Sequence, residues 1–187
     1  MLFRSTDISV EKLTSELKTV LELANRDLMA YGKNNNIRLG TTASVILFWS
    51  EQYICLHIGD SRIYHYSNDL KQITEDDNIA AEKAKGYYNS GKADISGDGK
   101  NILTRCIGIN PVINPHIYFG DYKLGDIFFL CCDGMYGKLD NNEISSTMLE
   151  RRFGNTSQLE PMLESLIEKV ISRGERDNIT GIIVGII

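Results

Sequence analysis

Two strongly apolar stretches, each with an aspartate at one end, place the tightest constraint on the fold. The first reads FFLCCDG over residues 128–134 and stops at Asp133. The second reads RDNITGIIVGII over residues 176–187 and turns apolar just after Asp177. Short runs rich in β-branched and aromatic residues are typical of buried strands. Because a buried carboxylate is costly without a cation or strong donors, we expect both acids to meet such partners at the strand ends.

The bulk composition indicates one globular domain over residues 1–187. The chain is 42% hydrophobic and 24% charged, which is ordinary for a domain with a packed core. A formal net charge of -5 argues against a nucleic-acid partner, which requires a basic surface. We expect no membrane association and a cytoplasmic location, because no apolar run has membrane-spanning length and the N-terminus is too polar for a signal peptide.

The cysteines support the same location. Their spacing contains no C-x-x-C pair, which indicates reduced, buried thiols rather than a zinc site or a disulfide framework. The four residues are Cys55, Cys106, Cys131 and Cys132.

The hydrophobic pattern changes from helical to extended and back along the chain. Residues 9–31 carry apolar side chains at three- and four-residue steps, which predicts a helix ended by Gly32 and the polar run at residues 33–36. Residues 41–73 form short β-rich segments between tight polar turns, which predicts an antiparallel meander. We expect further helices at 79–85, 143–152 and 158–173, and strands at 117–119, 126–132 and 179–187, the last buried on both faces. This order indicates an α+β fold.

Three aspartates are candidates for chemistry, although each also has a simpler structural interpretation. Asp133 precedes Gly134, so the backbone can turn and leave the carboxylate at the strand end, where Mg²⁺ or Mn²⁺ would suit its oxygens. Taken alone, an Asp-Gly pair after a strand is more often a turn. Asp177 equally suits an Asx turn before the last strand, and Asp60 a turn between two strands. No G-x-S-x-G elbow is present, although the sequence leaves a Ser/His/Asp or Cys/His hydrolase open.

Six short motifs in a fixed order are more specific than any one of them. They are G-T-T-A (40–43), G-D-S-R-I-Y (59–64), I-T-E-D (73–76), L-T-R-C-I-G (103–108), L-G-D-I-F-F-L-C-C-D-G (124–134) and R-D-N-I-T (176–180). This ordered set closely resembles the PPM family, also called PP2C, of metal-dependent protein serine/threonine phosphatases, and especially its bacterial members.

The resemblance implies an αββα four-layer sandwich of two antiparallel sheets flanked by helices. It also implies a site with two or more Mn²⁺ or Mg²⁺ ions, where Asp133 and Asp177 match the aspartates of the family's D-G and D-N motifs as metal ligands. Catalysis in that family uses a metal-activated water and no protein nucleophile. The implied substrates are phosphoserine and phosphothreonine proteins, and a cognate serine/threonine kinase is a further implied partner.

Two further segments align with the family without carrying a ligand. Residues 86–100 match a flap beside the site. Asp76 matches the aspartate of the T-x-D-H segment, where Asp77 replaces the histidine, and we assign Asp76 no site role.

The family's R-x-x-N-E-D and D-G-x-G-G segments have no counterpart in this sequence. Asp7 lies near the place where the second would end, but its surroundings differ from the motif. We therefore expect an N-terminally truncated domain with half or fewer of the carboxylates that a metal pair requires, and weak or absent hydrolysis by this chain. The alternative is a pseudophosphatase or binding module that keeps the fold without catalysis. The sequence does not identify the substrate protein, the metal occupancy or the oligomeric state.

Overall fold

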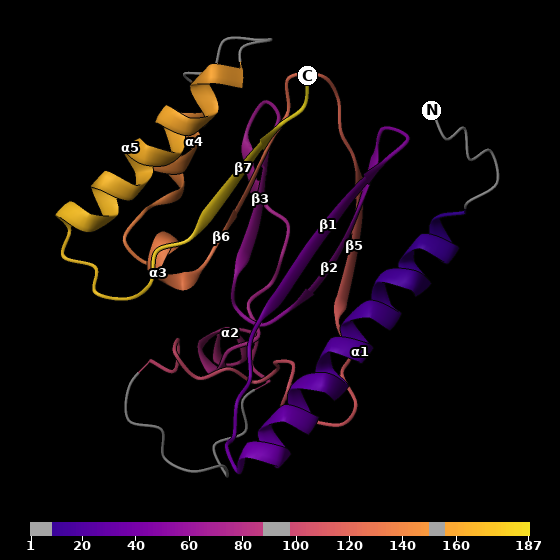
Figure 1. The fold of residues 1–187 in the computed structure, drawn as a ribbon. Helices are drawn as coiled ribbons and strands as arrows, with labels where there is room; N and C mark the ends of the chain where they lie inside the picture. Colours follow the sequence, from indigo (N-terminus) through magenta and orange to yellow (C-terminus); the bar gives the residue numbers. More distant parts are fainter. Residues whose placement is uncertain (1–8, 88–97, 150–155) are drawn as a thin grey trace.

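The computed structural model describes residues 9–87, 98–149 and 156–187 (Figure 1). Asp7 and most of the expected flap lie outside these ranges. Two antiparallel sheets face each other, with α1 outside one sheet and α4 and α5 outside the other. The predicted sandwich of two sheets flanked by helices is therefore confirmed.

In the described part of the chain, seven strands form the two sheets, and every neighbouring pair is antiparallel. The first sheet has the order β1 (Ala43–Trp49), β2 (Gln52–Ile58) and β5 (His116–Asp121). The second has the order β4 (Leu70–Gln72), β3 (Arg62–Tyr66), β6 (Ile127–Cys131) and β7 (Gly181–Gly185).

The expected meander over residues 41–73 is wrong at its centre, because β2 and β3 belong to different sheets. Gly59 lies between them with φ of +116°, a conformation that side-chain-bearing residues rarely adopt. A Cβ atom on Gly59 would lie only 2.3 Å from Cγ2 of Thr42. This close turn redirects the chain from one sheet to the other, so that only β1–β2 and β3–β4 are hairpins.

The helices are α1 (Val10–Asn35), α2 (Ile79–Ala84), α3 (Asp133–Tyr136), α4 (Asn141–Leu149) and α5 (Leu159–Ser172), with a 3₁₀ turn η1 at Thr156–Gln158. Ser9 caps α1 by accepting a hydrogen bond from the Lys12 amide at 3.3 Å. The helix continues through Gly32 and ends within the predicted polar run, at Asn35. Asn36 adopts the left-handed capping conformation, which asparagine tolerates, and its amide returns to the carbonyl of Gly32.

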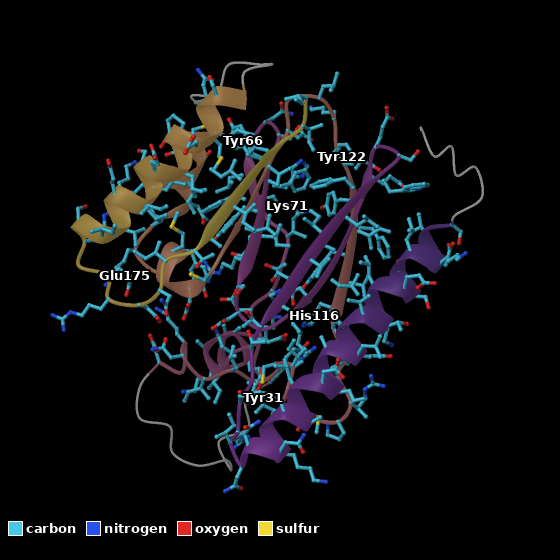
Figure 2. All side chains as sticks on the ribbon, viewed as in Figure 1. Tyr31, Tyr66, Lys71, His116, Tyr122 and Glu175 are labelled. Atoms are coloured by element: carbon cyan, nitrogen blue, oxygen red, sulfur yellow. The ribbon has the colours of Figure 1, made fainter. Side chains whose placement is uncertain are left out.

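The core has three layers of apolar side chains. Between the sheets, Phe128 of β6 packs with its ring centroid 5.3 Å from that of Tyr53 on β2. The other two layers join α1 to the first sheet and α4 and α5 to the second, and side chains fill these spaces in Figure 2. The expectation that the last strand is buried on both faces is wrong, since β7 is an edge strand and Ile182 is 54% exposed.

No helix in the described residues combines the length and apolar character needed to cross a membrane.

Candidate metal centre

The pairing of β6 with β7 brings the two predicted metal ligands to one end of the second sheet. Cys131, the last residue of β6, lies opposite Gly181, the first residue of β7. Because the strands are antiparallel, the segment after β6 and the segment before β7 leave the sheet at the same end. Asp133 opens α3 directly after β6, and Asp177 lies in the loop before β7.

Gly134 explains why the two segments can touch. A Cβ atom on Gly134 would lie 2.3 Å from the carbonyl oxygen of Asn178 and 3.3 Å from Cβ of Asp177. A side chain at this position would therefore separate the acid-bearing turns. The Asp-Gly sequence at the end of the apolar run is thus required by close packing as well as by the turn.

Each carboxylate keeps one oxygen in its own turn. Oδ1 of Asp133 accepts the Gly134 N–H at 2.9 Å, and Oδ1 of Asp177 accepts the Asn178 N–H at 2.7 Å. Within the described ranges, Oδ2 of neither acid forms a hydrogen bond or an ion pair. One oxygen of each acid is therefore available to a ligand.

Both acids line one pocket of about 460 Å³. Its lining contains cations as well as carboxylates. The charged lining residues are Arg62, Asp76, Lys100, Asp133, Lys138, Glu175 and Asp177. A pocket of this character can accept a metal ion and an anionic group side by side.

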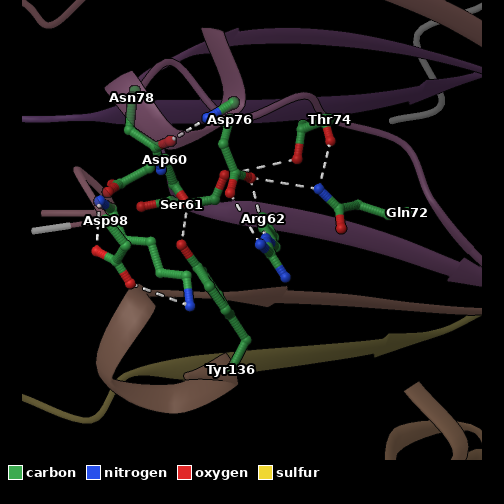
Figure 3. A network of polar contacts seen from close by, with 12 residues as sticks. Asp60, Ser61, Arg62, Gln72, Thr74, Asp76, Asn78, Asp98 and Tyr136 are labelled. Atoms are coloured by element: carbon green, nitrogen blue, oxygen red, sulfur yellow. Dashed lines mark hydrogen bonds and ion pairs between the residues drawn. The ribbon is translucent and has the colours of Figure 1, made fainter. Parts of the chain in front are cut away.

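One wall of the pocket is a rigid ion pair between Arg62 and Asp76 (Figure 3). Nε and Nη2 of Arg62 donate to the two carboxylate oxygens of Asp76 at 3.0 and 2.8 Å. The guanidinium also lies 3.7 Å from the ring centroid of Tyr136, whose hydroxyl donates to the Asp60 carbonyl at 2.9 Å. Such a bidentate pair stacked on an aromatic ring fixes both side chains. Asp76, to which the sequence assigned no site role, thus lies at the pocket with its charge already paired.

Asp60 is a third acid at the same end of the sheet. The register of β3 on β6 pairs Arg62 with Cys131, so Asp60, two residues before β3, lies near Asp133, two residues after β6. Burial raises the pKa of the Asp60 carboxyl to about 6, with further contributions from the charges of Asp133 and Asp76. Taken alone, the sequence around Asp60 favoured a structural turn. The proximity of Asp60 to Asp133 follows from the β3–β6 pairing, which the local sequence does not indicate.

Asp77, which replaces the family histidine, has a structural role. It is 3% exposed, and its carboxylate accepts the Gly59 N–H at 3.0 Å. The other oxygen lies 2.9 Å from Nε2 of His116 on β5. Asp77 therefore joins the sheet-switching turn to the first sheet.

The candidate ligand set is small. Within the described ranges, no group of three or more His, Cys, Asp or Glu side chains is arranged to hold a metal ion. Asp133 and Asp177 line the pocket. Asp60 does not line it, but its buried carboxyl lies close enough to Asp133 to be affected by that charge.

Comparison with known proteins shows what this arrangement is similar to. Protein phosphatase PhpP of Streptococcus pneumoniae D39 is 27% identical over 187 residues, covering 94% of this chain and 74% of that protein. The serine/threonine phosphatase of S. agalactiae superposes with a TM-score of 0.81 at 24% identity, covering 97% of this chain and 74% of that one. In sequence and fold, this chain is similar to bacterial serine/threonine phosphatases. The resemblance based on the six ordered motifs is confirmed, as is the expectation of a serine/threonine phosphatase class of enzyme.

A third comparison concerns the metal. The catalytic domain of the serine/threonine phosphatase PstP, described in complex with two manganese ions, superposes with a TM-score of 0.76 at 23% identity. It covers 95% of this chain, which spans 73% of that domain. No family model matches this chain.

Proposed function

We propose that residues 1–187 form a metal-dependent protein serine/threonine phosphatase domain that acts on phosphoserine and phosphothreonine. The meeting of Asp133 and Asp177 in one pocket carries this proposal. The substrates would be phosphorylated proteins in the cytoplasm, and a serine/threonine kinase would be the opposing partner.

The residues present fit one hard divalent cation. Asp133 and Asp177 each offer a carboxylate oxygen, and Mg²⁺ or Mn²⁺ accepts such donors while retaining several waters. The buried Asp60 carboxyl, whose pKa is raised to about 6, lies in a field of negative charge that a cation would relieve. A cation bound there would lower the pKa of a water molecule and neutralise charge on phosphoryl oxygens.

The chain's own residues would bind and orient the phosphate. Lys100 and Lys138 line the pocket with the acids, and both can attract a phosphate dianion. Arg62 and Asp76 form a fixed wall that limits how the phosphate can lie. No protein nucleophile is required, because the attacking group would be water.

We expect weak turnover by this polypeptide. Asp133 and Asp177 supply enough donors for one cation but too few for a bridged pair, because the other lining acids are engaged, Asp76 by Arg62 and Glu175 by two backbone amides. The pseudophosphatase alternative is not favoured, because both acids keep an oxygen available among the described residues.

Manganese titration tests the metal site. The free-ion electron paramagnetic resonance signal of Mn²⁺ measures binding to the wild-type chain and to Asp133→Asn and Asp177→Asn. We expect each substitution to weaken Mn²⁺ binding at least tenfold, by removal of a charged ligand. Asp27→Asn, on the outer surface of α1, is the matched control and should bind as the wild type does. Unchanged affinity in the two pocket variants would refute the assignment.

Hydrolysis is measured separately with phosphoserine and phosphothreonine peptides and with p-nitrophenyl phosphate. We expect slow release of phosphate that depends on Mn²⁺ or Mg²⁺ and is abolished in Asp133→Asn. Rapid turnover would overturn the expectation of weak activity. Metal binding without any phosphate release would favour the binding-module alternative.

A further inference from the structure

The thiol of Cys132 bridges the two segments that carry the acids. Its Sγ lies 3.1 Å from the Asn178 carbonyl oxygen, to which it donates, and 3.2 Å from the Thr180 amide, from which it accepts. The Cys132 amide also donates to the Thr180 carbonyl at 3.2 Å. The sulfur therefore adds two cross-links beyond the end of the β6–β7 ladder.

The hydrogen bonds of the Cys132 sulfur involve residues that neighbour the two acids in the sequence. Cys132 directly precedes Asp133, and Asn178 directly follows Asp177. The same Asn178 carbonyl is approached closely by Gly134, where a Cβ atom would lie 2.3 Å away. Contacts from Sγ and from Gly134 thus fix the direction of the Asn178 carbonyl, which lies one residue after Asp177.

The other cysteines lack this arrangement. Cys131 and Cys55 are buried in apolar clusters. Cys106 is half-buried beside Gly40 and does not line the pocket. Among the cysteines in the described residues, only Cys132 has a sulfur that forms hydrogen bonds with two backbone groups.

We propose that Cys132 is a positioning residue that sets the separation of Asp133 and Asp177, and thereby the affinity of the pocket for a divalent cation. This inference rests on the proposed function. A thiol can donate and accept weakly at once, as this bridge requires. Groups that orient metal ligands commonly change metal affinity tenfold or more when they are removed.

Three substitutions separate hydrogen bonding from volume. Cys132→Ala removes both, Cys132→Val restores bulk without a donor or acceptor, and Cys132→Ser restores the donor and acceptor. We expect Mn²⁺ affinity to fall about tenfold in the alanine and valine variants and to stay within about threefold of wild type in the serine variant. Cys106→Ala is the matched control, and its affinity should not change.

A second measurement needs no metal. In the metal-free chain, hydrogen exchange followed by ¹⁵N NMR reports on the Thr180 amide, which donates a hydrogen bond to Sγ of Cys132. Its exchange should be at least about tenfold faster in Cys132→Ala and Cys132→Val, with wild-type rates in Cys132→Ser. Thermal unfolding without metal checks that each variant is folded. If either Cys132→Ala or Cys132→Val does not fold, the folded apolar variant is compared with Cys132→Ser.

The outcomes are distinguishable. If Asp133→Asn binds Mn²⁺ as tightly as wild type, the proposed function fails. If Asp133→Asn loses affinity while Cys132→Ala and Cys132→Val retain it, only the positioning role is overturned. Equal losses in Cys132→Ser and Cys132→Ala, or unchanged Thr180 exchange in the apolar variants, would also overturn it.

Discussion

At the scale of single residues, the acids near the pocket differ in how their charges are balanced. Asp76 has a bidentate partner in Arg62. Asp133 and Asp177 accept only backbone N–H groups of their own turns among the described residues, and Asp60 is buried with a raised pKa. Because uncompensated charge is costly in a partly buried site, these three acids mark where a cation would stabilise the protein most.

Asp60→Asn tests whether the charge of Asp60 is uncompensated in the metal-free protein. The pKa of Asp60 is raised from 3.8, its ordinary value, to about 6 in the folded chain. Between pH 4 and pH 6 the unfolded chain therefore binds fewer protons than the folded chain, and the free energy of unfolding falls as pH rises. Asparagine does not titrate. We expect Asp60→Asn to be more stable than wild type by about 2 kcal/mol at pH 7, relative to their difference at pH 4.

Urea unfolding at the two pH values measures this difference. A stability gap that is the same at pH 4 and pH 7 would show that Asp60 is not perturbed in the folded chain.

The residues of the site were predictable to different extents. Asp133 and Asp177 stand out in the sequence because each interrupts a long apolar run at its end. Asp60 lies in an ordinary turn sequence, and its place beside Asp133 depends on the pairing of β3 with β6, which are far apart in the chain. Cys132 reads as an apolar residue until its contacts with Asn178 and Thr180 are seen.

At the scale of helices and strands, two glycines decide how the elements meet. Gly59 lets the chain pass from the first sheet to the second, and Gly134 lets α3 pack on the loop before β7. Both positions leave less than the normal space for a Cβ atom. The turns are therefore determined by sterics as well as by backbone conformation.

Gly59→Ala should destabilise the chain strongly. The new Cβ atom would combine an unfavourable φ of +116° with a contact of 2.3 Å to Thr42, so we expect a loss of at least about 2–4 kcal/mol. Gly86→Ala is the matched control, because Gly86 also has positive φ, +74°, but no atom within 4 Å of the added Cβ. Its loss should be about 1 kcal/mol. Equal losses in chemical denaturation would contradict the steric explanation.

Gly134→Ala should affect both stability and the metal site. Its Cβ atom would meet the Asn178 carbonyl and push the two acid-bearing turns apart. We expect about 2–3 kcal/mol of destabilisation and weaker Mn²⁺ binding in the fraction that remains folded. Calorimetric titration with Mn²⁺ checks the second effect, and wild-type affinity would show that the turns can separate without disturbing the site.

The elements themselves were largely predictable, and their pairing was not. The strand expected at residues 126–132 contains β6 (Ile127–Cys131), because its apolar run has a turn before it and Asp133 after it. The short helix α3 was missed, since four residues carry no helical periodicity. The sheet order was missed because nothing in the turn at residues 59–61 distinguishes a hairpin from a passage between sheets.

At the scale of the whole molecule, the layer between the sheets joins the two halves of the fold. Tyr53 and Cys55 of β2 lie against Phe128 of β6 and Ile63 of β3 in one buried cluster. Phe128 is completely buried, with its ring 4.3 Å from that of His65 and stacked on it. Loss of this layer would uncouple the sheets, and the pocket depends on the second sheet.

Phe128→Ala should therefore lower the free energy of unfolding by about 3–5 kcal/mol, because it leaves a cavity in the central layer. Phe119→Ala on the outer part of β5 is the control, since that ring is 57% exposed. We expect a change of about 1 kcal/mol or less there. Comparable losses in the two variants, measured by urea denaturation, would argue against a central role for Phe128.

The position of β6 between β3 and β7 links correct folding to ion binding. Asp60, Asp133 and Asp177 lie at the ends of these three adjacent strands, so a slip of one residue in either pairing would turn the apolar side chains to the wrong faces and disperse the acids. Uptake of manganese during refolding would consequently report native strand alignment, and could be followed in real time beside a fluorescence signal for collapse.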